Sequence, residues 1–237
     1  MRSISITLAA LSMLTAAAQT QAVLTVVSPD GNNEIKFSKP GKELTYKVAY
    51  KGSDVILPSR AGLEIDNRVW EMALGKRDLA QPDCWMDLLT VDSISHGVGV
   101  DTTWTPLYGE RSTVRDHYNS GTLHLSRKDK SDYRLDIEVR AYDQGVAFRY
   151  FFPEHPAAIF HKVVGDLTDY TFPAGVKAFS EQWAQARFDV GPVDSISEPV
   201  ERALTLELPD GKWLALLDAD VDDWCLTKFR ARRDKPS

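Results

Sequence analysis

The stretch Tyr133-Arg-Leu-Asp-Ile-Glu-Val-Arg-Ala-Tyr-Asp-Gln-Gly-Val-Ala-Phe-Arg-Tyr-Phe-Phe152 decides the fold class of this chain. Over residues 133–140 apolar side chains alternate with charged ones, which is the pattern of a β-strand with one buried face. Residues 141–145 have the composition of a turn, and a second apolar run follows until Pro153 ends it. The stretch therefore predicts two strands joined by a turn, with one side covering an apolar core.

The same pattern recurs along the chain. Residues 34–38 and 44–50 alternate, and the Lys-Pro-Gly-Lys-Glu segment between them has the residues of a hairpin turn. Residues 204–208 and 213–217 flank an Asp-Gly pair, which is the strongest short-range hairpin signal in the sequence. We expect a further short strand over 168–173. No window sustains a helical period with caps at both ends. Many short strands separated by turns predict an all-β fold, a β-sandwich.

Composition and charge exclude one class of partner. Of the 237 residues, 43% are hydrophobic and 26% are charged, which is ordinary for a globular domain. The formal net charge is −6, and the Lys and Arg residues are scattered rather than gathered in a patch. We therefore expect no nucleic-acid binding.

Residues 1–22 have the features of a secretory signal peptide. Arg2 gives a short positive region, residues 4–14 are mostly apolar, and small residues follow that suit a cleavage site. The apolar run is too short to span a bilayer, and no second one follows it. No cysteine lies near the cleavage region to carry a lipid. We expect an exported protein, periplasmic or secreted, without a membrane anchor, whose mature domain covers residues 23–237.

The chain contains two cysteines, Cys84 and Cys225. An oxidising compartment would allow them to form a disulfide, and two buried free thiols are the alternative. Their spacing does not decide between the two.

Several kinds of catalytic site are excluded by motif. The sequence has no Gly-x-Ser-x-Gly elbow, no phosphate-binding loop and no dinucleotide fingerprint. Its five histidines show no metal-ligand spacing. Glu181 is a better candidate, because it lies among aromatic residues in the segment 178–188. Its carboxylate is either paired with Arg187 or presented to a ligand.

The stretch Trp104–Asn119 is the second candidate. It combines aromatics, charges, a Pro and a Gly between two strand-like zones, and loops held by a rigid scaffold often carry recognition. The alternative is a structural corner in which Trp104 packs and Arg115 pairs with Asp116 or Glu110.

Together these segments resemble the N-terminal domain of glycoside hydrolase family 97, the bacterial α-glucosidases and α-galactosidases. The most specific motif is Trp104-Thr-Pro-Leu-Tyr-Gly-Glu110 followed by Val114-Arg-Asp-His-Tyr-Asn119. Arg140–Tyr150 is nearly as telling, and the segments 27–36 and 204–217 match as well. The resemblance covers nearly all of residues 24–229.

The resemblance implies a large antiparallel β-super-sandwich, similar in fold to galactose mutarotase. In the family a catalytic (β/α)₈ barrel follows this domain and carries the catalytic carboxylates. The resemblance thus implies that the chain stops before the barrel, holds no catalytic residue and does not hydrolyse a glycoside alone. Its partners would be that barrel and an oligosaccharide substrate, which we expect Trp104, Glu110 and Arg115 to contact.

The resemblance also implies a calcium ion at the active site, with one Glu reaching in from the N-terminal domain. Alignment without gaps places Gln185 at this position, and a small gap places Glu181 there. Calcium takes six to eight oxygen ligands, so one such residue completes a site that other residues make.

Two other functions remain open at this point. One is a stand-alone carbohydrate-binding sandwich in which Trp70, Trp85 or Trp104 stacks on sugar rings. The other is a mutarotase-like enzyme, which would need a His/Glu pair such as His117 and Glu110. Preference for a glucoside or a galactoside, and the stereochemical outcome, would be set by the barrel.

Overall fold

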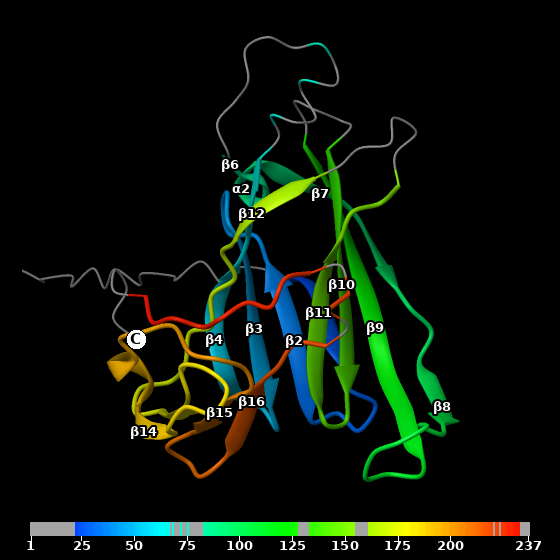
Figure 1. Cartoon of the computed structure of the whole chain (residues 1–237). Coiled ribbons are helices and arrows are strands. Elements are labelled where there is room, and N and C mark those ends of the chain that lie inside the picture. Colours follow the sequence, from blue (N-terminus) through cyan, green and yellow to red (C-terminus); the bar gives the residue numbers. More distant parts are fainter. Residues whose placement is uncertain are drawn as a thin grey trace, which may run out of the picture.

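A computed structural model describes residues 22–232, apart from 67, 69–71, 73–74, 76–82, 128–132, 155–160, 220 and 223. It confirms the all-β fold with antiparallel sheets (Figure 1). Among the described residues, α2 (Trp85–Leu88) and the 3-10 turn η1 (Val193–Ser195) are helical, and Arg68 and Met72 also have helical backbone. No helix in this part of the chain is long and apolar enough to cross a membrane.

Two large sheets form the sandwich. The first has the order β1-β2-β3-β4, with strands β1 (Ala22–Val27), β2 (Asn33–Ser38), β3 (Leu44–Tyr50) and β4 (Ser53–Ala61). The second has the order β11-β10-β9-β7, and β8 also pairs with β9. Its strands are β7 (Leu89–His96), β8 (Val100–Trp104), β9 (Val114–Arg127), β10 (Arg134–Tyr142) and β11 (Gly145–Phe151).

Two smaller sheets adjoin them. One has the order β12-β5-β6, from β5 (Leu63–Asp66), β6 (Asp83–Cys84) and β12 (Lys162–Asp166). The other, called here the β13–β16 sheet, has the order β14-β13-β15-β16. Its strands are β13 (Lys177–Ser180), β14 (Asp189–Pro192), β15 (Leu204–Glu207) and β16 (Trp213–Leu216).

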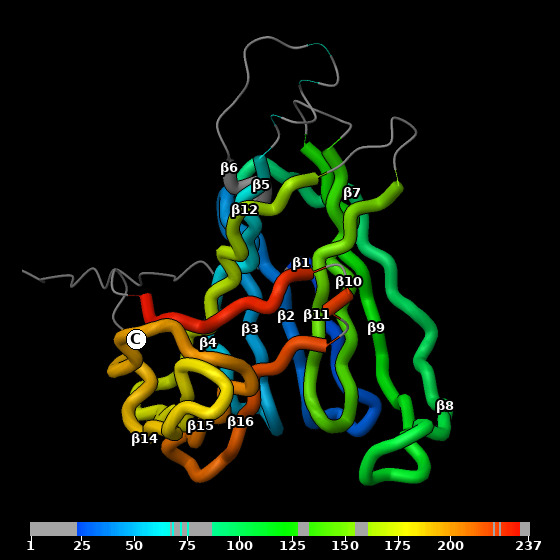
Figure 2. The backbone as a smooth tube through the Cα atoms, in the orientation of Figure 1, coloured from blue at the N-terminus to red at the C-terminus, as the bar shows by residue number. Residues whose placement is uncertain are grey.

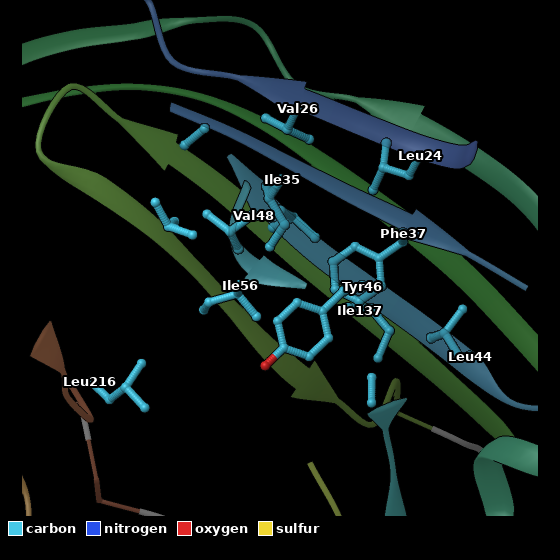
Figure 3. Packing of buried hydrophobic residues seen from close by; sticks show 14 of the residues in the cluster. Leu24, Val26, Ile35, Phe37, Leu44, Tyr46, Val48, Ile56, Ile137 and Leu216 are labelled. Atoms are coloured by element: carbon cyan, nitrogen blue, oxygen red, sulfur yellow. The ribbon is translucent and has the colours of Figure 1, made fainter. Parts of the chain in front are cut away.

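A single main core lies between the two large sheets and the inner face of the β13–β16 sheet (Figure 3). Phe37, Ile137 and Leu206 are each fully buried in it, although they come from three different sheets. β1 crosses β9 so closely that a Cβ atom on Gly121 would lie 2.9 Å from the Leu24 side chain. A larger residue at position 121 would therefore have to displace the Leu24 side chain.

The expected hairpins are present. β10 and β11 pair from Tyr142↔Gly145 to Asp136↔Phe151, as the opening stretch of the sequence predicts. β15 and β16 pair around the Asp-Gly turn, where Gly211 has φ +81°, a value that L side chains rarely adopt. The expected strand over 168–173 is not formed. It is replaced by one isolated bridge, Leu57↔Thr171, because the Thr171 N–H donates to the Ser59 hydroxyl at 2.8 Å rather than to a backbone carbonyl of β4.

The C-terminal segment 226–232 lies across the sandwich. Phe229 forms two backbone hydrogen bonds with Val200, of 2.7 and 2.9 Å, and its ring packs edge-on against Tyr170. In Figure 2 this segment (red) runs across the strands toward the end marked C. The last described residues are therefore held against the folded domain.

Two expectations fall partly outside the described residues. Of the signal peptide, only Ala22 at the start of β1 is described.

Cys225 carries a free, exposed thiol, so the disulfide with Cys84 is not formed. Trp70 also lies outside the described residues, as do the positions of the Trp85 and Cys84 side chains.

His161 gives the fold a pH dependence. Its ring stacks on Phe152, with centroids 4.6 Å apart, and burial lowers the pKa of His161 to about 4. An unfolded histidine has a pKa of about 6.5, so the unfolded chain binds this proton more readily. The contribution of neutral His161 to the free energy of unfolding is therefore fully present above pH 6.5 and is lost as pH falls toward 4.

We predict that wild-type protein loses roughly 1–2 kcal/mol more unfolding free energy between pH 7 and pH 4 than His161→Phe does, after discounting for partial exposure. The phenyl ring keeps the stacking and cannot titrate. Urea unfolding of both proteins at both pH values measures the difference. Equal losses would contradict the prediction.

Candidate functional site

An open pocket of about 130 Å³ lies where β13, β14 and η1 meet. Its polar lining comes mainly from the loop after β13, the start of β14 and the turn after η1. The lining residues are Ala178, Ser180, Glu181, Gln182, Asp189, Val190, Gly191, Pro192, Ser195, Ile196, Ser197, Glu198 and Val200. The pocket includes Glu181, one of the two candidate metal ligands.

Local backbone chemistry shapes this pocket. β14 ends at Pro192, whose carbonyl accepts a 2.6 Å hydrogen bond from the Ser195 hydroxyl and so closes the turn η1. The Val193 N–H donates to the Val176 carbonyl at 3.0 Å, which attaches η1 to the residue before β13. The wall of the pocket is therefore tied to the sheet rather than free in solvent.

The pocket is acidic, with Glu181, Asp189 and Glu198 in its lining. Carboxylate oxygens are the ligands that calcium prefers. However, within the described residues no three His, Cys, Asp or Glu side chains lie close enough to hold a metal ion together. The donor set has the right chemistry for a hard cation, and other oxygen ligands would have to complete it.

The backbone around Glu181 is anchored by residues distant in sequence. The Glu181 carbonyl accepts a 2.8 Å hydrogen bond from the Glu201 N–H. The Gln182 carbonyl accepts one of 2.7 Å from the Lys228 ammonium, which also pairs with the Glu201 carboxylate at 2.8 Å. Lys228 thereby joins the C-terminal segment to the loop that carries Glu181.

Gln185 is placed differently. It is exposed at the tip of a turn closed by a 2.8 Å hydrogen bond from Ala186 N–H to the Trp183 carbonyl, and its φ is +75°. It does not line the pocket. Arg187, the expected partner of Glu181, pairs instead with Asp189 at 3.4 Å. Of the two candidate ligands, the structure brings Glu181 alone into the pocket.

The stretch Trp104–Asn119 forms the β8–β9 hairpin. Arg115 makes a bidentate ion pair with Asp101 across the two strands, at 2.7 and 2.8 Å, and its guanidinium lowers the pKa of the Asp101 carboxyl. The expected pairing with Asp116 or Glu110 was wrong, because antiparallel register places Asp101 two residues from Thr103, which lies opposite Arg115, and so on the same face of the hairpin. Arg115 is thus held by a partner on its own hairpin.

The tip of this hairpin projects into solvent. Trp104 is 54% exposed, Tyr108 is 89% exposed, and Glu110 is exposed as well. None of the three lines the pocket of Glu181. His117, at the base of the hairpin, bonds to Asp143 at 2.7 Å rather than to Glu110. The His/Glu pair that a mutarotase-like enzyme would need is therefore not formed.

Sequence reasoning missed Asp189, Glu198, Ser195 and Lys228. No motif or spacing marks them, because they come together only through the pairing of β13 with β14 and through the path of the C-terminal segment. The aromatic-rich run before β14 was the one local signal near this place.

The chain is similar to a known family of proteins and to a curated enzyme. A family model described as "Glycosyl-hydrolase 97 N-terminal" matches residues 26–237. A retaining α-galactosidase from Bacteroides thetaiotaomicron is 27% identical over 166 residues, which are 70% of this chain and 21% of that protein. The chain therefore spans about a fifth of this curated relative.

Solved structures show the same fold. A glycoside hydrolase family 97 enzyme from Pseudoalteromonas sp. strain K8, in complex with panose, matches with a TM-score of 0.76 and 22% identity. The match covers 89% of this chain and 30% of that enzyme, and the complex of the same enzyme with acarbose matches equally. A β-arabinopyranosidase matches with a TM-score of 0.65 and 17% identity, over 81% of this chain and 31% of that one.

Lys228→Met should loosen the loop of Glu181. Without the ammonium, the half-buried Glu201 carboxylate loses its partner and the Gln182 carbonyl loses a donor. We expect the Glu201 amide to exchange with deuterium about tenfold faster, equivalent to about 1.4 kcal/mol of local stability.

The matched control is Lys212→Met, which removes the exposed partner of Asp210 in the β15–β16 turn. It should leave exchange at Glu201 unchanged. Mass spectrometry of peptides that cover residues 181–201 measures both variants. If the two variants behave alike, Lys228 does not anchor this loop.

Proposed function

The chain belongs to the glycosyl-hydrolase 97 N-terminal family, and on this premise we propose that it is the accessory domain of a glycoside hydrolase that acts on α-glucosides or α-galactosides. One observation carries the proposal: the family match runs over residues 26–237 while the chain spans 21% of the curated α-galactosidase relative. The catalytic machinery would then lie in a barrel outside these residues. The names of the relatives support the substrate class.

The size of the pocket favours an accessory role over a catalytic one. Sites that enclose a small organic ligand usually have volumes of about 300–1,000 Å³, and the pocket beside Glu181 has about 130 Å³. Such a space suits an ion or one functional group better than a disaccharide. A glycosidase also needs two carboxylates on opposite sides of the scissile bond, and this pocket has no room for a sugar between them.

We propose that Glu181 lends one carboxylate oxygen to a calcium ion whose other ligands come from the barrel. The pocket's oxygen donors fit calcium in kind, but among the described residues no three His, Cys, Asp or Glu side chains are gathered closely enough to hold it. Bound calcium would supply a fixed positive charge beside the sugar. The part of this chain is to hold the Glu181 loop in place, through the hydrogen bonds from Glu201 and Lys228.

The β8–β9 hairpin would contribute to binding of the oligosaccharide substrate. Trp104 and Glu110 are exposed, and Arg115 is held on the same hairpin by Asp101. We propose that these residues contact the oligosaccharide where it leaves the barrel. Export is part of the proposal, on the signal-like residues 1–22, and sequencing the N-terminus of the protein recovered outside the cytoplasm tests it.

A stand-alone carbohydrate-binding module is the second candidate. The exposed aromatic rings of Trp104 and Tyr108 favour it, because such rings stack on sugar faces. In this reading the chain would bind oligosaccharides without any barrel.

One pair of measurements separates the two functions. The purified 237-residue chain should not hydrolyse nitrophenyl α-glucoside or α-galactoside above the buffer rate, and calorimetric titration with malto- or galacto-oligosaccharides should show no binding. Clear binding that Trp104→Ala abolishes would favour the stand-alone module. Robust hydrolysis by this chain alone would overturn both readings.

The calcium ligand is tested in a polypeptide that carries both this domain and the barrel. Glu181→Gln should weaken Ca²⁺ binding about tenfold or more, because a neutral amide replaces a charged ligand. Glu138→Gln, which removes the partner of the distant Arg149 on β11, should leave binding unchanged. Calorimetric titration with Ca²⁺ measures both. If Gln185→Ala weakens binding and Glu181→Gln does not, the assignment is wrong.

A further inference from the structure

The β13–β16 sheet has an apolar surface on the side away from the core. Its inner side belongs to the main core, with Ala178, Leu206 and Leu216 buried. The side chains on the opposite side alternate with these along each strand. We call this opposite side the outer face, and its members are Lys177, Phe179, Val190, Thr205, Glu207, Trp213, Ala215 and Leu217.

Register brings the apolar members of the outer face together. Val190 lies opposite Phe179 on the neighbouring strand, and Phe179 lies opposite Thr205, which in turn lies opposite Ala215. The Phe179 and Trp213 rings are 5.1 Å apart between centroids. The apolar members thus come from β13, β14, β16 and the residue after β16, with Thr205 of β15 lying between them.

The outer face is open to solvent in the isolated chain. Val190 and Trp213 are each 60% exposed, and Leu217 is 67% exposed. Contiguous exposed apolar surface of this kind usually marks a contact with another protein segment. The sequence of β16 and its next residue, Trp-Leu-Ala-Leu-Leu, is apolar at every position. An unbroken apolar run is typical of a strand that is covered on both sides.

The polar members of the outer face carry no net charge. Lys177 and Glu207 lie opposite each other on neighbouring strands and form an ion pair of 3.3 Å. A surface without net charge, with apolar and aromatic side chains in the majority, does not suit a nucleic acid, and it offers few free hydrogen-bonding groups to a sugar. It suits the apolar surface of a folded protein, where Trp and Phe are enriched at contact centres.

We propose that the outer face is the surface on which the C-terminal continuation of this polypeptide docks, a proposal that rests on the proposed function. The chain spans 30% of the solved family 97 enzymes, so most of such a protein lies outside these residues. The segment 226–232 places the start of any continuation beside this sheet. Lys228 binds the Gln182 carbonyl just after β13, and Phe229 pairs with Val200. A domain that follows would begin within reach of the outer face.

Thiol labelling measures whether this face is covered. In a background with Cys84→Ser and Cys225→Ser, Ala215→Cys reports on the outer face, because Ala215 is exposed on β16 and does not line the pocket of Glu181. Ser53→Cys, at the exposed start of β4, is the matched control. Labelling rates with a maleimide are compared between the 237-residue chain and the full polypeptide that the gene encodes, after circular dichroism has shown that each variant folds.

We expect both thiols to react at similar rates in the 237-residue chain. In the full polypeptide the Ala215→Cys thiol should react at least about tenfold more slowly, while the control keeps its rate. Equal rates in both proteins would overturn the proposal, and so would a gene product that ends at Ser237. Protection that appears in the short chain as its concentration rises would identify a second copy as the occupant instead, and would also overturn it.

The same full polypeptide separates this proposal from the proposed function. Glycoside hydrolysis with an unprotected Ala215→Cys thiol means that the function stands and the docking surface is wrong. A protected thiol without hydrolysis of α-glucosides or α-galactosides means that the docking surface stands and the proposed function fails.

Discussion

One apolar core that receives side chains from three sheets is the constraint on which the rest of the structure depends. Phe37, Ile137 and Leu206 lie in it together although they come from separate sheets. Their burial fixes the β13–β16 sheet against the sandwich. Because Glu181 follows β13 directly, the packing of this sheet on the core also fixes the position of Glu181. The position of a polar side chain thus depends on apolar residues.

The fold class could be predicted because its signals are local. The alternation over 133–140 appears in a short window, and β10 has that burial pattern in the structure. The Asp-Gly pair before Lys212 needs only its two neighbouring runs to specify a hairpin. The expected strand over 168–173 failed for a different reason. Its pairing with β4 is interrupted where the Thr171 N–H donates to the Ser59 hydroxyl, and these residues are 112 positions apart, so no local pattern shows this contact.

The site could be predicted in part only. Glu181 was identifiable from its aromatic neighbourhood and from the family resemblance, whereas its anchors were not. Lys228 is 46 residues from Gln182 in sequence, and the two meet because Phe229 pairs with Val200. Arg115 shows the same limit, since its partner Asp101 is 14 residues away and follows from the register of β8 with β9. Contacts between segments depend on topology, which a single sequence encodes weakly.

The late position of Lys228 has a consequence for biosynthesis. A chain leaves the ribosome from its N-terminus, and domains begin to fold as they emerge. Every strand from β1 to β16 precedes Lys228, so the sandwich can close while the acidic loop of Glu181 still lacks this clamp. During synthesis the strands of the sandwich therefore emerge before Lys228, the residue that anchors the Glu181 loop. A nascent chain stalled before Lys228 would have every strand from β1 to β16, with the Glu181 loop held by the Glu201 N–H but not yet by Lys228.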